Sequence, residues 1–155
     1  RGELNLSKID FNLLFEDILD FYKVYTQNSG IDFNIKVDQS KTFINDKSIL
    51  ELILHNLVSN AIKYQKIDSS DKRINLSVET HNGDARILVS DNGIGIPKEA
   101  IQDIFRLFFR ASDQADGMGF GLYNVKTAIQ KLKGKIEVES EIDNGSTFIV
   151  TIPSK

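Results

Sequence analysis

Apolar and polar residues alternate first at the amino end of the chain, where Leu4, Leu6 and Ile9 each have polar neighbours. Alternation with a period of two predicts a short strand. Asp10 stands before a run with helical spacing and suits an N-cap, because its carboxylate can accept from an early helical amide. We expect this helix to end near residues 29–30, with an apolar face of Phe11, Leu14, Phe15, Ile18, Phe21, Tyr22 and Tyr25.

The next segment alternates strictly from Ile31 to Val37 and predicts a strand, and residues 42–45 indicate another short one. Asp46 is well placed to begin a second helix. The apolar face of that helix comprises Leu50, Leu54, Leu57 and Ala61.

Two hairpins dominate the second half of the chain. Residues 74–80 and 86–89 flank an Asn82-Gly83 turn, and residues 136–138 and 148–152 flank Asn144-Gly145. Between them we expect a short helical stretch from Pro97 to about Ile104, a polar loop over 112–116, and a helix from near Phe120. The apolar face of that helix is Leu122, Val125, Ala128, Ile129 and Leu132, and its closing residues are Lys131, Lys133 and Gly134.

Helices interleaved with mostly antiparallel strands predict a two-layer α/β (α+β) sandwich, in which helices cover one face of a mixed sheet. The 155 residues suit a single domain over 1–155, since no repeat or low-complexity linker interrupts them. Residues 66–72 are expected to form a polar surface loop.

The amino-acid composition argues against several classes of function. The net charge of -3 gives no reason to expect nucleic-acid binding, and the absence of cysteine with only two histidines excludes thiolate and histidine-rich metal sites. No apolar run approaches ~20 residues, so we expect neither a membrane span, nor direct membrane contact, nor a secretion signal in this segment. The start at Arg1 suggests a piece of a longer protein, which could itself be anchored in a membrane.

The second predicted helix carries a polar stripe beside its apolar face. Asn56, Asn60 and Lys63 fall within about 60° of one another on a helical projection. Amide oxygens suit magnesium that phosphates already hold, and a lysine supplies positive charge to those phosphates. A solvated helix face explains the stripe equally well.

Asp91 follows an apolar strand and can accept a hydrogen bond from an exocyclic amine such as that of adenine. Gly93 and Gly95 would let the backbone approach a flat base. The alternative is a plain Asp-Asn-Gly turn. A turn does not require the second glycine, Ile96 and Pro97 in series.

A third motif, Gly117, Gly119 and Gly121, opens the last predicted helix, whose amino end attracts anions such as phosphates. Glycines at such a junction also serve plain packing. We expect the base of the loop that follows to dock onto the core through Phe105, Phe108 and Phe109. Arg106 and Arg110 lie beside these aromatic residues in the sequence, and Arg110 can reach phosphate. Residues 111–116 have the length and polarity of a lid. His55 is interpreted as a packing or hydrogen-bonding residue, and His81 as exposed.

Taken together, these motifs resemble those of the ATP-binding catalytic domain of bacterial two-component sensor histidine kinases, in the wider group of gyrase, Hsp90 and MutL ATPases. Residues 56–64 resemble the N box of that family, 91–96 its G1 box, 105–110 its F box and 117–122 its G2 box. The segment 145–148 resembles its closing strand motif. The resemblance covers essentially the whole chain and implies a Bergerat-type fold.

The resemblance also implies a site for Mg-ATP. It assigns the adenine amine to Asp91, magnesium to Asn56 and Asn60, and catalytic roles to Asn56 and Lys63. The residues implied in ATP binding are Asn56, Asn60, Lys63, Tyr64, Asp91, Gly93, Gly95, Ile96, Arg110, Gly117, Gly119, Phe120, Gly121 and Leu122. Phe120 departs from the leucine more usual at its position, and the lid is short.

The same resemblance implies a protein-histidine kinase whose acceptor histidine lies in a separate dimerisation domain, with a response regulator as the next partner. Residues 1–9 resemble the linker and first strand that follow that domain. We expect a monomeric, cytoplasmic piece, and the resemblance allows a parent protein in the inner membrane. In the relatives that hydrolyse ATP, a glutamate usually stands at the position of Asn56 and activates water. An amide cannot act as that general base, so Asn56 favours phosphotransfer over hydrolysis. Two alternatives stay open, a nucleotide-binding scaffold without transfer and a serine kinase of the anti-sigma type.

Overall fold

The structure, a computed structural model, describes residues 2–106 and 121–155. Its main sheet has five strands in the order β2-β4-β5-β7-β6. The strands are β2 (Ile31–Asp38), β4 (Lys72–His81), β5 (Asp84–Asp91), β7 (Gly145–Pro153) and β6 (Lys135–Glu141). Only β2 and β4 pair in parallel, so the sheet is mixed and mostly antiparallel.

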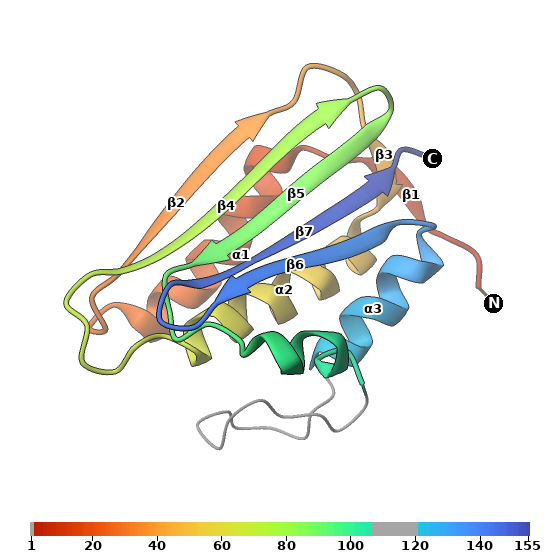
Figure 1. Ribbon diagram of the computed structural model, residues 1–155. Helices are drawn as coiled ribbons and strands as arrows, with labels where there is room; N and C mark the ends of the chain where they lie inside the picture. Colours follow the sequence, from red (N-terminus) through yellow and green to blue (C-terminus); the bar gives the residue numbers. More distant parts are fainter. Residues whose placement is uncertain (1, 107–120) are drawn as a thin grey trace.

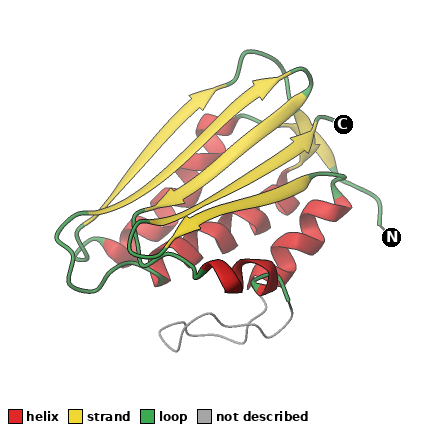
Figure 2. Ribbon diagram, viewed as in Figure 1, coloured by secondary structure: helices red, strands yellow, loops and turns green. Residues whose placement is uncertain are grey.

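The α-helices of the described ranges lie on one face of this sheet, as Figures 1 and 2 show. They are α1 (Phe11–Thr26), α2 (Lys47–Lys63) and α3 (Gly121–Lys131), and a short 3-10 helix, η1 (Lys98–Asp103), precedes the undescribed segment. A separate two-stranded sheet pairs β1 (Leu6–Lys8) with β3 (Ile44–Asp46). The two-layer sandwich predicted from the sequence is therefore confirmed.

The helix starts follow from their caps. The Asp10 carboxylate accepts from the Leu13 amide at 3.2 Å, and the Asp46 carboxylate accepts from the Ile49 amide at 3.2 Å. The hairpin strands extend beyond their expected ranges, and two other bounds also differ. The first helix ends at Thr26, because residues 27–30 form a turn that leads into Gly30 at φ +78°, and the short strand begins two residues later than expected, at Ile44.

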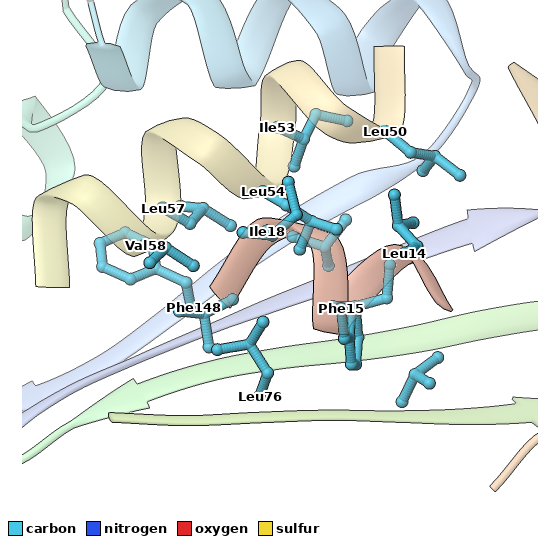
Figure 3. Packing of buried hydrophobic residues seen from close by; sticks show 14 of the residues in the cluster. Leu14, Phe15, Ile18, Leu50, Ile53, Leu54, Leu57, Val58, Leu76 and Phe148 are labelled. Atoms are coloured by element: carbon cyan, nitrogen blue, oxygen red, sulfur yellow. The ribbon is translucent and has the colours of Figure 1, made fainter. Parts of the chain in front are cut away.

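The core fills the space between the helices and the inner face of the sheet (Figure 3). Phe15 and Ile18 of α1, Leu54 of α2, and Leu76 and Phe148 of the sheet are all at most 2% exposed. Burying each such side chain stabilises the fold by about 1.5–3 kcal/mol. Phe21, expected on the apolar face of α1, is instead 50% exposed.

Within the described ranges, no helix combines the length and the apolar character that crossing a membrane requires.

Candidate nucleotide-binding site

The inner face of the sheet changes from apolar to polar at one end. Val89 of β5 pairs with Phe148 of β7, and Phe148 pairs with Val138 of β6, so this cross-strand row is apolar. One row further along, Asp91 pairs with Ser146, which pairs with Ser140. Directly paired residues share a face, so a carboxylate and two hydroxyls lie side by side where the core ends.

Asp91 is the last residue of β5 and is 9% exposed. Burial raises the pKa of its carboxyl to about 6, and hydrogen bonds from the backbone amides of Gly93 and Ser146 offset part of that rise. The Gly93 amide donates to Oδ1 at 2.8 Å. Among the described residues no cation forms an ion pair with this carboxylate. A buried acceptor of this kind is suited to a ligand that brings a hydrogen-bond donor.

The loop after Asp91 is held against the end of α2. The amide of Ile94 donates to the Tyr64 carbonyl at 2.9 Å, and a Cβ on Gly93 would lie 2.1 Å from the same carbonyl oxygen. Only glycine permits this approach without a backbone shift. The loop therefore packs closely against the backbone at the end of α2 and is not an isolated turn.

The second glycine of the motif has a different constraint. Gly95 has φ +75°, and a Cβ there would lie 2.2 Å from the Glu141 carbonyl oxygen at the end of β6. Ile96 follows and is buried, with its amide donating to Ser140 Oγ at 2.7 Å. Gly93 and Gly95 therefore seat the loop between α2 and the β6–β7 hairpin.

Asn92 faces the start of β4. Its Oδ1 accepts from the Arg73 amide at 2.8 Å, and its Nδ2 donates to the Asp71 carbonyl at 2.8 Å. The amide oxygen and the amide nitrogen of Asn92 thus both form hydrogen bonds within the protein, so this side chain has a structural role: it ties the loop to the start of β4.

On α2 the polar stripe runs along the side that meets α3. Asn56 Nδ2 donates to the Leu52 carbonyl at 2.8 Å, which leaves its Oδ1 directed toward Gly121, 3.3 Å from the position of a Cβ there. Asn60 is half-buried, Lys63 is exposed, and Tyr64 is the half-buried C-cap of the helix. The apolar face Leu50, Leu54, Leu57 and Ala61 is buried as predicted.

The start of α3 brings part of the third motif to the same place. Gly121 opens the helix beside Asn56, and Leu122 packs against the core. Phe105 stacks edge-on against Phe148 with ring centroids 6.4 Å apart, and the Lys126 ammonium lies 5.3 Å from its ring centroid. The expectation that Phe105 docks onto the core is confirmed. Other expected site residues, namely Phe108, Phe109, Arg110, Gly117, Gly119, Phe120 and the loop 111–116, lie outside the described residues.

The two histidines lie away from Asp91. His55 Nδ1 lies 3.2 Å from the Tyr22 hydroxyl, and its ring is edge-on to Phe21. His81 is exposed at the opposite end of the β4–β5 hairpin. Both agree with their interpretation from the sequence. No group of three His, Cys, Asp or Glu side chains in the described part of the chain is arranged to hold a metal ion.

Ser140 and Ser146 were not identified as site residues from the sequence. Ser146 is 7% exposed and its amide reaches Asp91, while Ser140 Oγ lies 2.7 Å from Ser146 Oγ. The resemblance of the segment 145–148 to a family motif is a sequence signal for Ser146, and Ser140 has no such signal.

Comparisons with known proteins point to one family. Residues 45–155 match the model of the family described as "Histidine kinase-, DNA gyrase B-, and HSP90-like ATPase". The sensor protein RprX of Bacteroides fragilis (strain YCH46) is 33% identical over 161 aligned residues, which cover 99% of this chain and 30% of RprX. The chain thus spans less than a third of the length of this curated relative.

Solved structures give the same result. The catalytic domain of histidine kinase ThkA superimposes with a TM-score of 0.83 at 26% identity, covering 97% of both chains. Full-length ShkA in complex with AMPPNP gives a TM-score of 0.87 at 26% identity, covering 98% of this chain and 32% of ShkA. ThkA has also been solved in complex with the response regulator protein TrrA, with a TM-score of 0.78 at 25% identity over 97% of this chain and 42% of that one.

The fold of this chain is shared with histidine kinase catalytic domains, and its curated relatives are sensor histidine kinases. The chain therefore belongs to the histidine kinase-, DNA gyrase B- and HSP90-like ATPase family.

Proposed function

We propose that this chain binds Mg-ATP at the polar end of its sheet and serves as the catalytic domain of a protein-histidine kinase. The observation that carries the proposal is the buried carboxylate of Asp91, which has no cationic partner among the described residues. The AMPPNP bound to the similar kinase ShkA supports a nucleotide as the ligand.

The adenine amine would donate to Asp91. The Gly93 amide uses one lone pair of Oδ1, and the base would donate to a remaining lone pair of the carboxylate. Gly93 and Gly95 would act through the loop, which they seat against the Tyr64 and Glu141 carbonyls, and Ile96 and Leu122 would supply apolar surface.

Magnesium would be held by the amide oxygens of Asn56 and Asn60 together with the phosphates. The orientation of Asn56 fits this role, since its nitrogen is bound to the Leu52 carbonyl and its oxygen is left toward the start of α3. When bound, the ion would neutralise charge on the phosphates. Lys63 and Tyr64 would lie near phosphate or ribose, and Gly121 with Arg110, Gly117, Gly119 and Phe120 would surround the triphosphate.

The transfer would pass the γ-phosphoryl group to a histidine nitrogen of a separate dimerisation domain. The nitrogen lone pair forms the new N–P bond while the bond from phosphorus to the β,γ-bridging oxygen breaks, and the electron pair leaves with ADP. Asn56 supports transfer over hydrolysis, because an amide cannot act as a general base on water. His55 is engaged by Tyr22 and His81 lies at the far end of the hairpin, so neither suits the acceptor.

The proposed next partner is a response regulator, which the complex of the similar kinase ThkA with TrrA supports. We propose a cytoplasmic domain over residues 1–155, monomeric in isolation, in which residues 1–9 continue from the dimerisation domain.

Calorimetric titration of the chain with an ATP analogue, with and without magnesium, tests the nucleotide site. Asp91→Ala should abolish binding, whereas Asp84→Ala, an exposed aspartate at the other end of β5, should leave it unchanged. GTP should bind weakly. Equal binding by Asp91→Ala and the parent chain would place the nucleotide elsewhere.

Incubation with ATP and an added histidine-containing dimerisation domain tests the transfer. Acid-labile phosphoprotein is the expected product. Acid-stable phosphoprotein would point to a serine kinase, and ATP binding without any phosphoprotein would point to a scaffold.

A further inference from the structure

We propose that Ser140 is a positioning residue that fixes the hydroxyl of Ser146 as a hydrogen-bond acceptor, so that the site prefers a base carrying an amine over one carrying a carbonyl. This inference rests on the proposed function, because it concerns how the same site distinguishes its nucleotides. Asp91 of β5, Ser146 of β7 and Ser140 of β6 lie side by side on one face of the sheet.

Ser140 Oγ makes three short contacts. It lies 2.7 Å from the Ile96 amide, 3.0 Å from the Gly145 carbonyl oxygen and 2.7 Å from Ser146 Oγ. A hydroxyl has one proton to donate and two lone pairs to accept with. The amide of Ile96 can only donate, and the carbonyl of Gly145 can only accept.

One assignment of protons satisfies all three contacts. Ser140 donates to the Gly145 carbonyl and accepts from the Ile96 amide, which leaves its second lone pair for the proton of Ser146. Any other assignment leaves one of these part-buried contacts without a hydrogen, and losing a hydrogen bond there costs free energy. The proton of Ser146 is therefore committed to Ser140.

Ser146 then offers only lone pairs to a ligand at Asp91. The carboxylate of Asp91 likewise offers only lone pairs once it has accepted from the Gly93 and Ser146 amides. A base with an exocyclic amine brings the donor that these oxygens need. At the exocyclic position a 6-oxo base has an acceptor in place of the amine, and oxygens that offer only lone pairs reject it there.

The adjacent positions provide a matched control. Ser90 and Thr147 form a second cross-strand hydroxyl pair at 2.8 Å, one residue along β5 and β7. Successive side chains of a strand point to opposite faces, so this pair lies on the face away from Asp91. Its loss removes an equivalent hydrogen bond without touching the site.

The test compares the affinities of ADP and IDP, which differ in an amine against a carbonyl on the base, by calorimetry on the full chain. In Ser140→Ala the Ser146 hydroxyl can rotate and donate, so the ratio of the IDP to the ADP dissociation constant should fall by about fivefold. Ser90→Ala should leave the ratio unchanged. A loosened fold would weaken both nucleotides by the same factor, so equal weakening in Ser140→Ala, or no change, would overturn the proposal.

A double variant tests whether Ser140 acts through Ser146. Ser140→Ala should have no further effect on the ratio in a Ser146→Ala background, and an additional drop there would contradict the mechanism. Should Ser140→Ala fail to fold in a thermal melt, Ser146→Ala alone carries the test, because it removes the oriented acceptor and should also lower the ratio. If the parent chain binds no ADP, the proposed function fails; if it binds ADP through Asp91 but Ser140→Ala keeps the ratio, only this inference fails.

Discussion

The buried carboxylate of Asp91 should destabilise the folded chain at neutral pH, and Asp91→Asn should reveal by how much. Its pKa is about 6 in the folded state against 3.8 for an unperturbed aspartate. Because the folded pKa lies above the unfolded one, the folded state holds the proton more tightly. The stability that this proton contributes is complete below pH 3.8 and is lost as the pH rises through about 6.

At 1.36 kcal/mol per pH unit, the full contribution is about 3 kcal/mol. At pH 5 the folded carboxyl is still mostly protonated while the unfolded one is mostly ionised, so roughly 1–2 kcal/mol remains. By pH 8 almost nothing remains. The parent chain should therefore lose roughly 1–2 kcal/mol of unfolding free energy from Asp91 between pH 5 and pH 8.

Asp91→Asn has no proton to lose, so its stability relative to the parent chain should rise by roughly the same 1–2 kcal/mol between the two pH values. Urea unfolding of both proteins at pH 5 and pH 8 measures this change. Imperfect hydrogen bonds of the new amide cancel, because they act equally at both pH values. Asp84→Asn, at an exposed position of the same strand, should show no such change. An Asp91→Asn effect that is constant with pH, or that shrinks toward pH 8, would refute the assigned burial cost.

Three further predictions concern the loop, the metal ligands and the core. Gly93→Ala places a Cβ 2.1 Å from the Tyr64 carbonyl oxygen, so we expect the unfolding free energy to fall by roughly 2–3 kcal/mol and the Tm, measured by calorimetry, by roughly 5–10 °C. A Tm that falls by less than about 2 °C would contradict the contact. Asn56→Ala should weaken ATP binding at least about tenfold with magnesium and little without it, as isothermal titration would measure, whereas an equal loss in both conditions would argue against a ligand role. Leu54→Ala, at a fully buried position, should cost about 2–5 kcal/mol in urea unfolding, and Leu13→Ala, 52% exposed, less than about 0.5 kcal/mol; similar costs would show that α2 does not pack as described.

The elements could be predicted from the sequence where periodicity is strong. Asp10 and Asp46 marked the helix starts because capping is local chemistry, and the turn at Asn82-Gly83 followed from residues that tolerate positive φ, here +52° and +86°. The exposure of Phe21 was not predictable, because helical spacing indicates a face but not how far the neighbouring layer extends over it.

The candidate site was partly predictable for a related reason. Asp91 stood out because it ends an apolar strand, but the contact that requires Gly93 is with Tyr64, on a helix far away in the sequence. Ser140 and Ser146 are ordinary strand residues until the register places them beside Asp91. Strand register depends on the whole sheet, so no local pattern could show that these two serines lie beside Asp91.

The position of β7 also has a consequence for the order of folding. This last strand of the chain lies inside the sheet, between β5 and β6, rather than at its edge (Figure 1). During synthesis at about 5–20 residues per second, Asp91 emerges several seconds before Ser146. Until then β5 has an open edge and its carboxylate lacks the Ser146 amide. The nascent chain therefore cannot complete a binding site before β7 inserts, and a chain truncated before β7 should expose the unpaired edge of β5, which chaperones recognise.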